Sequence, residues 1–198
     1  MLTAAILAGG RARRMSGRDK GALRVGGRSI LDRELAVIHA VTPHIVIIGG
    51  AADAGTRGGY PVVPDRVPDA GALGGLYTAL LESKGDQVLV VACDMPFLTV
   101  PFLTHLARVG GGADAAVPRD HRSRHPLCAS YAPRVAARLK QRIDAGRLSV
   151  IDALSDLDVL EIGPDEIAPF DPDGTLLSNV NTLDDYEQAL TSAGPRRS

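Results

Sequence analysis

Three short, uninterrupted apolar runs constrain the fold of this chain more than any other feature. They are Ala4–Ala8, Ile45–Ile48 and Val88–Ala92, and each is followed closely by glycine or aspartate. Apolar runs of this length predict strands buried on both faces, which is typical of parallel sheets. Helical patterns lie between the runs, so the sequence predicts an α/β fold with a mostly parallel central sheet and helices on both faces.

The remaining elements are predicted from capping residues, periodicity and turn signals. Residues from the first strand to about Arg28 are rich in Gly and Arg and are predicted to form an ordered loop. The predicted helices are Ser29–Ile38 (with a Ser29/Asp32 capping box), Gly75–Leu81, Pro101–Ala107, Pro133–Asp144, Ser149–Leu154 and Leu183–Thr191 (with Thr182 as N-cap). The further predicted strands are Val62–Val63, Ala115–Val117, Leu127–Tyr131 and Val159–Ile162.

Length and composition limit the classes of protein that need to be considered. The 198 residues predict a single domain over 1–193, followed by a disordered tail over 194–198. A formal net charge of −1 argues against broad electrostatic capture of nucleic acid or of an anionic membrane. No apolar stretch reaches the roughly 20 residues of a membrane span. We therefore expect a cytoplasmic protein that binds neither nucleic acid nor membrane.

The end of the first predicted strand, Leu7-Ala8-Gly9-Gly10, is the first candidate site. Glycines after a strand let backbone N–H groups face a ligand with no side chain between them. Arg14 and Lys20 follow and supply positive charge for phosphate oxygens. The spacing does not match a Walker A loop or the G-x-G-x-x-G pattern.

Two aspartates follow other predicted strands. Asp94 closes the run Val88–Ala92, and a carboxylate there either ligates Mg²⁺ or caps the following turn. Asp65 precedes the glycine-rich stretch Gly71–Leu76, where it either accepts hydrogen bonds from a base or ribose or caps a turn. Because ligands gather at the carboxyl ends of parallel strands, both aspartates are candidates for one site.

Two further segments carry polar groups. Asn179 and Asn181 point to the same side of an extended backbone, where they either hold a phosphate, a metal-bound water or a pterin edge, or only form a turn and a helix cap. The basic loop Arg119–His125 is either an anion-binding loop or a solvated one. Its two histidines have i,i+4 spacing, but Pro126 argues against the helix that a zinc site would need.

These motifs together resemble the MobA family of molybdenum cofactor guanylyltransferases (molybdopterin-guanine dinucleotide biosynthesis protein A). The resemblance spans nearly the whole chain in the order of the family. Its pieces are Leu7–Gly10, Arg14-Met15, Asp19–Gly21, Gly26–Leu31, Asp65 with Gly71–Leu76, Ala92–Phe97, Arg124–Pro126 and Asn179–Thr182.

The resemblance implies a Rossmann-like nucleotidyltransferase fold and an Mg²⁺-dependent enzyme that transfers GMP from GTP to the phosphate of molybdopterin. It also implies transient contacts with other molybdenum cofactor biosynthesis proteins or with acceptor enzymes. The implied catalytic residues are Arg14, Lys20 and Asp94, with Asp94 as the metal ligand. The implied substrate-binding residues are Leu7, Ala8, Gly9, Gly10, Lys20, Asp65, Asp94, Asn179 and Asn181.

One departure from the family pattern and several alternatives remain at this point. Some members of the family have Asn after the second strand, whereas this chain has Ile48-Gly49-Gly50, so that nucleotide contact stays unassigned. Many CTP-using relatives read Leu-Ala-Ala-Gly in the first loop, and we hypothesise that the missing methyl at Gly9 makes room for guanine. The alternatives are a molybdopterin cytidylyltransferase, a sugar-1-phosphate nucleotidyltransferase and a non-catalytic nucleotide-binding module.

Overall fold

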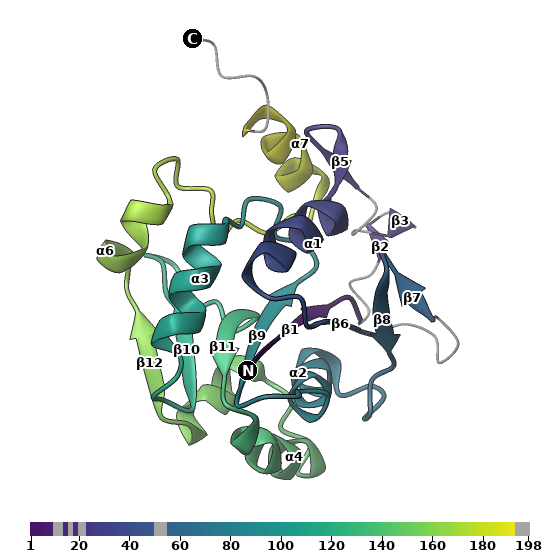
Figure 1. The fold of residues 1–198 in the computed structure, drawn as a ribbon, viewed down its shortest axis with the longest axis vertical. Coiled ribbons are helices and arrows are strands. Elements are labelled where there is room, and N and C mark those ends of the chain that lie inside the picture. The colour runs from purple at the N-terminus through teal and green to yellow at the C-terminus, as the bar shows by residue number, and fades with distance from the viewer. Residues whose placement is uncertain (10–13, 16–17, 20–22, 50–54, 193–198) are drawn as a thin grey trace.

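The computed structural model describes residues 1–9, 14–15, 18–19, 23–49 and 55–192 of the chain. At its centre, eight described strands form one sheet in the order β12-β10-β11-β9-β1-β6-β8-β7 (Figure 1). These strands are β1 (Leu2–Leu7), β6 (Ile45–Ile48), β7 (Thr56–Arg57), β8 (Tyr60–Val63), β9 (Gln87–Ala92), β10 (Ala115–Pro118), β11 (Cys128–Tyr131) and β12 (Val159–Ile162).

Most neighbouring strands of this sheet run parallel. β1 pairs in parallel with both β6 and β9, β6 with β8, and β10 with β12. β11 is antiparallel to both β9 and β10, and β7 is antiparallel to β8. The predicted α/β fold with a mostly parallel central sheet is therefore confirmed.

Helices cover both faces of the sheet. They are α1 (Ile30–Val41), α2 (Gly71–Leu81), α3 (Val100–Val109), α4 (Ala136–Asp144), α5 (Val150–Ala153), α6 (Pro164–Ile167) and α7 (Leu183–Ser192). Among the described residues, 3₁₀ turns lie at Pro133–Val135, Leu154–Asp156 and Ala168–Phe170. One core cluster joins the sheet to α1 and α3, and a second joins it to α2, α4 and α5. None of the described helices is both long and apolar enough to cross a membrane.

Strand β1 shows how the sheet divides the two clusters. Ala4 and Ile6 belong to the cluster under α1 and α3, whereas Ala5 and Leu7 belong to the cluster under α2 and α4. Successive side chains of a strand point to opposite faces, so one apolar run supplies both cores. Each fully buried Leu or Ile contributes about 1.5–3 kcal/mol relative to an exposed one.

The start of a helix follows a capping residue in α1, whereas the glycine-rich stretch before Leu76 does not delay the start of α2. Ser29 caps α1, accepting a hydrogen bond from the N–H of Asp32 at 3.0 Å. Helix α2 begins at Gly71 and not at the predicted Gly75. Glycine is a poor helix former, but Leu73 is fully buried against the sheet, and tertiary packing of this kind outweighs intrinsic propensity.

The stretch expected to be one loop contains short hairpins. β2 (Arg14–Met15) pairs with β3 (Arg18–Asp19), and β4 (Arg24–Val25) pairs with β5 (Arg28–Ser29). Gly26 and Gly27 join β4 to β5 with φ of 58° and 83°, the positive values that a tight two-residue hairpin turn requires. This hairpin lies beside α7 in Figure 1, and a third, small core joins them.

Candidate functional site

The carboxyl ends of four parallel strands lie at the same level. In the sheet register, Leu7 pairs with both Ile48 and Ala92, and Ile48 pairs with Val63. The backbone continues this alignment one residue further, since the N–H of Ala8 donates to Ile48 O at 2.8 Å. The residues that follow these strands therefore line one edge of the sheet, as the sequence predicted.

The loops after β1 and β6 touch at two glycines. A Cβ on Gly9 would lie 3.1 Å from Asp65 Oδ2 and 3.2 Å from the Cα of Gly49. A Cβ on Gly49, whose φ is 97°, would lie 2.4 Å from the Cα of Gly9. The space left by the missing methyl at Gly9 is thus used by Asp65 and Gly49, which gives Gly9 a packing reason besides the hypothesis of room for guanine.

The side chain of Asp65, two residues after β8, points toward Gly9 at the end of β1. Its Oδ2 approaches Gly9, and its Oδ1 lies 3.7 Å from the place a Cβ would take on Gly75 of α2. The two glycines are therefore the reason that a carboxylate fits between the first loop and α2. Asp65 and Asp94 follow β8 and β9, which are three strand spacings apart in the sheet order, or roughly 14 Å.

Asp94 lies in a turn that several elements hold. The N–H of Cys93 donates to Leu7 O at 3.2 Å, and the N–H of Val180 donates to Asp94 O at 2.8 Å. Two residues outside the predicted motifs, Arg33 and Glu34 of α1, hold the next part of the turn. The Asp94 side chain itself is half-buried at the sheet edge.

The segment Asn179–Thr182 forms the predicted helix cap and lies against the Asp94 turn. Its backbone forms a helix cap, because the N–H groups of Asn181 and Thr182 both donate to Asp185 Oδ2 at 2.8 Å, and Thr182 Oγ1 accepts from the N–H of Asp185 at 3.1 Å. The bond from Val180 to Asp94 places the segment against the Asp94 turn. Cap chemistry thus accounts for the backbone, and the side chain of Asn179 is exposed.

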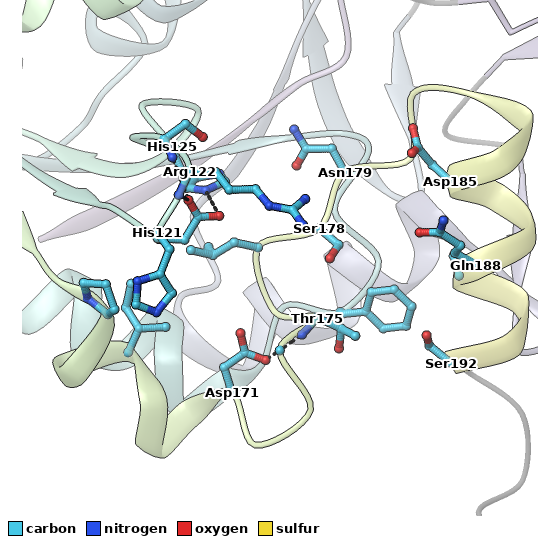
Figure 2. A pocket seen from close by; sticks show the side chains of 18 of the residues that line it. His121, Arg122, His125, Asp171, Thr175, Ser178, Asn179, Asp185, Gln188 and Ser192 are labelled. Atoms are coloured by element: carbon cyan, nitrogen blue, oxygen red, sulfur yellow. Dashed lines mark hydrogen bonds and ion pairs between the residues drawn. The ribbon is translucent and has the colours of Figure 1, made fainter.

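A cavity of about 640 Å³ opens beside this segment. Figure 2 shows Asn179 between the basic loop and helix α7, with Asp171 and Thr175 on a further side of the cavity. The lining residues are Phe97, Asp120–Ser123, His125, Pro164, Ile167, Ala168, Asp171, Gly174, Thr175, Leu177–Val180, Asp185, Gln188, Ala189 and Ser192. The cavity adjoins the Asp94 turn through Val180 and Phe97.

The basic loop is ordered by its own acidic residue and by β12. Asp120 Oδ1 accepts from the N–H groups of Arg122 and Ser123, both at 2.7 Å. Burial opposes ionisation of Asp120, but these hydrogen bonds and the nearby His125 imidazole hold its pKa below the usual value.

Two of the loop's arginines have a structural partner. Arg119 and Arg124 both form ion pairs with Glu161, and the pKa of that carboxyl is lowered as a result. His121 and Arg122, by contrast, line the cavity (Figure 2). The alternative of an anion-binding loop therefore applies to His121 and Arg122 more than to Arg119 and Arg124.

Three of the expected site residues cannot be placed fully. Gly10 and Lys20 lie outside the described residues, and Arg14 is described only as the first residue of β2. Leu7, Ala8, Gly9, Asp65 and Asp94 gather at the sheet edge, and Asn179 lies at the cavity beside it.

The described residues offer a divalent cation few protein ligands. Among them, no group of three or more His, Cys, Asp or Glu side chains could hold a metal ion. Mg²⁺ usually binds to one or two carboxylates and completes its shell with water and substrate phosphates. A single aspartate at the mouth of a nucleotide site therefore fits such an ion, and Asp94 is the candidate.

Comparison with known proteins agrees with this arrangement. Residues 4–157 match the family model of the MobA-like NTP transferase domain. The chain belongs to the MobA-like NTP transferase family. A probable molybdenum cofactor guanylyltransferase from Pelotomaculum thermopropionicum is 34% identical over 191 residues, which cover 96% of this chain and 93% of the relative. The predicted family is confirmed.

Solved structures of MobA-like and related proteins share the fold. The crystal structure of molybdopterin-guanine dinucleotide biosynthesis protein A from Archaeoglobus fulgidus superposes with a TM-score of 0.82 at 27% identity, covering 97% of this chain and 98% of that one. Rv0371c from Mycobacterium tuberculosis, solved in complex with manganese, has a TM-score of 0.66 at 20% identity and covers 96% and 98%. At that identity, the second likeness concerns the fold alone.

Proposed function

We propose that this chain transfers GMP from GTP to the phosphate of molybdopterin and releases pyrophosphate. The observation that carries the proposal is the hydrogen bond of 2.8 Å from Val180 N–H to Asp94 O. It joins the strand ends, where we place the nucleotide, to a cavity of about 640 Å³ that has room for the acceptor molybdopterin. The relatives named as guanylyltransferases support the choice of GTP and molybdopterin.

The nucleotide lies across the strand ends in this proposal. Asp65 accepts hydrogen bonds from the nucleoside, next to Gly9. Leu7, Ala8 and Gly10 are the other proposed contacts of the first loop. The triphosphate runs toward Asp94, about three strand spacings away. An extended nucleotide suits this separation, with one carboxylate for the nucleoside and the other for the phosphates.

A divalent cation, which we propose to be Mg²⁺, is held by Asp94. When bound, such an ion neutralises charge on the phosphate oxygens and orients them. Lys20 and Arg14 add fixed positive charge to the same phosphates. Two like unit charges about 4 Å apart repel by ~4 kcal/mol at an effective dielectric of about 20, so several cationic groups are needed to bring two polyanions together.

The acceptor occupies the cavity beside Asn179. Asn179 and Asn181 face the reacting phosphates or the pterin, and His121 and Arg122 supply hydrogen-bond donors from the basic loop. The cavity is lined by apolar residues such as Phe97 and Ile167 as well as by amides, hydroxyls and both signs of charge. It therefore suits a heterocycle that carries polar groups and a phosphate.

The reaction needs little covalent chemistry from the protein. An oxygen of the molybdopterin phosphate attacks the α-phosphorus of GTP in line, and the bond from that phosphorus to the β-phosphate oxygen breaks. The nucleophile is already an anion, so no strong general base is required. Positioning and electrostatic preorganisation by Asp94, Lys20 and Arg14 therefore provide most of the rate enhancement.

We also propose a domain organisation, a cellular location and partners for the protein. Residues 1–193 form one catalytic domain, in which the sheet edge and the cavity serve the same reaction. The enzyme works in the cytoplasm, and its product passes to other molybdenum cofactor proteins or acceptor enzymes by transient contact.

A pyrophosphate-release assay with GTP, CTP and ATP, each with and without molybdopterin, tests the proposal. We expect release with GTP only when molybdopterin is present. Release with CTP would indicate a cytidylyltransferase, and release with a sugar phosphate as acceptor would indicate another branch of the superfamily. GTP binding with no product in the presence of Mg²⁺ would leave a non-catalytic binding module.

A further inference from the structure

Helix α1 holds the turn of Asp94 through two consecutive side chains. The N–H of Met95 donates to Glu34 Oε1 at 2.9 Å. Arg33 Nε donates to Pro96 O at 3.1 Å. The two residues that follow Asp94 are therefore tied to one turn of helix α1, in addition to the bond from Val180 to Asp94 itself.

Glu34 is an unusual residue for its place. It lies on the buried face of α1 with Ile30 and Ile38, and it is only 2% exposed. Its Oε2 is buried and has no hydrogen-bond partner among the described residues. Burial raises the pKa of Glu34 well above the usual value, the hydrogen bond from Met95 opposes this, and the charge of Asp94 raises the pKa further.

A carboxyl at this position has a cost that a leucine would not have. Transfer of a polar group into an apolar interior is unfavourable unless a hydrogen bond compensates it. The bond that Glu34 does make goes to the turn that presents Asp94. Without that acceptor, the buried N–H of Met95 would lose its partner.

We propose that Glu34 is a positioning residue for Asp94: its bond to the Met95 N–H, assisted by Arg33, fixes the turn so that the Asp94 carboxylate faces the metal and the triphosphate. This inference rests on the proposed function for the role of Asp94. Glu34 itself does not touch the substrates.

Three variants separate positioning from general stability. Glu34→Leu removes the acceptor for Met95 and keeps the site apolar. Glu34→Gln keeps an acceptor oxygen of the same shape. Thr3→Val is a matched control, because Thr3 is also buried and its hydroxyl accepts from the N–H of Lys84 at 3.2 Å, but it lies at the opposite edge of the sheet.

The first measurement is hydrogen exchange at the Met95 amide in the full chain, followed by NMR. We expect exchange to be faster in Glu34→Leu, and to stay slow in Glu34→Gln and Thr3→Val. The second is the Mn²⁺ concentration that half-saturates the GTP complex, measured by electron paramagnetic resonance. We expect this concentration to rise only in Glu34→Leu.

The third measurement is steady-state turnover. A misplaced Asp94 should lower kcat of Glu34→Leu by roughly 10- to 100-fold while KM for GTP stays close to that of the wild-type protein. Glu34→Gln should recover most of this loss. If Glu34→Leu does not fold, Arg33→Met takes its place, since it removes the bond to Pro96 from the same helix, and the same split between kcat and KM is expected.

Slow Met95 exchange in folded Glu34→Leu, or an Mn²⁺ dependence and kcat equal to those of Thr3→Val, would overturn the inference. Wild-type protein without GTP-dependent transfer to molybdopterin would instead contradict the proposed function. The exchange measurement needs no substrate, so the two failures are distinguishable.

Discussion

Two aspartates at the same sheet edge have different surroundings, and we expect them to have different effects. Asp65 lies against the backbone of Gly9 and near Gly75, where a nucleoside would be held before and during reaction. Asp94 lies in a turn that also contacts the cavity segment through Val180. Contacts kept throughout the reaction affect KM, whereas contacts made in the transition state affect kcat.

Replacing Asp94 by Ala should lower kcat by roughly 10²-fold, the loss typical of one preorganised stabilising group. We expect the same for Lys20→Ala. Asp86→Ala is the matched control, because Asp86 precedes the same strand β9 at its other end and its side chain is 91% exposed. Near-normal turnover in folded Asp94→Ala, measured by pyrophosphate release, would remove Asp94 from the mechanism.

Replacing Asp65 by Asn should instead raise KM for GTP. Asn keeps the size that fits beside Gly9 but loses the charge, and a hydrogen bond to a charged group contributes roughly 1.5–3 kcal/mol, or about 10- to 100-fold. The expected change in kcat is small. A fall in kcat with unchanged KM would indicate that Asp65 acts on the reacting phosphates.

At the scale of elements, the strand ends depend on the contact between the loops after β1 and β6. Gly49 has a φ of 97°, which side chains rarely adopt, and a Cβ there would meet Gly9 at 2.4 Å. Gly9 and Gly49 approach each other through backbone atoms, so a side chain at either position would push the two apart. The position of Gly9 is thus set partly by Gly49, which follows β6.

Gly49→Ala should therefore destabilise the fold by about 2 kcal/mol or more, from backbone strain together with the clash. Urea unfolding would measure the loss. Gly112→Ala serves as the control, because a Cβ at Gly112 meets nothing within 4 Å and its φ is not positive. Equal stability of the two variants would show that the loops separate easily.

The elements that the sequence predicts well are those with local signals. The buried strands β1, β6 and β9 follow from apolar runs, and the start of α1 follows from the Ser29 cap. The antiparallel direction of β11 does not follow from its sequence, because an apolar run buried in a sheet reads the same in either direction. The hairpin β4–β5 has a signal, Gly26-Gly27, that the loop interpretation did not use.

Part of the candidate site could likewise be predicted from the sequence and part could not. Its strand-end residues are predictable because parallel strands end at one edge. The cavity is not, since the stretch from Pro164 to Val180 has little regular structure and meets the basic loop only in the folded chain. Glu34 could have been noticed in the sequence. It lies four residues after Ile30 and four before Ile38, a position at which the helical pattern predicts an apolar residue.

At the scale of the whole molecule, an ionic cluster at Asp114 ties together the part of the chain that carries β10, α4 and β12. Asp114 Oδ1 accepts from Arg134 Nε at 2.9 Å, its Oδ2 accepts from the N–H of Asp158 at 3.2 Å, and Arg138 pairs with Oδ2 as well. Burial acts to raise the pKa of Asp114, but these hydrogen bonds and the guanidinium charges outweigh burial and lower it.

This cluster predicts a specific pH dependence. Because the folded pKa of Asp114 lies below that of the unfolded chain, about 3.9, its stabilisation is complete above that pH and is lost as the pH falls through the folded pKa. Asp114→Asn should be roughly 2 kcal/mol less stable than wild type at pH 7, with the difference shrinking in acid. A constant difference in urea unfolding from pH 7 to pH 2 would contradict this assignment.

Catalysis as proposed depends on one arrangement, in which the strand ends hold GTP with its nucleoside at Gly9 and Asp65 and its phosphates at Asp94. A crystal structure of the chain with GTP and Mg²⁺, without acceptor, tests it most directly. We expect an Asp94 carboxylate oxygen about 2.1 Å from the metal, with the cavity beside Asn179 open. A nucleotide bound inside that cavity, or a metal held by other residues, would contradict it.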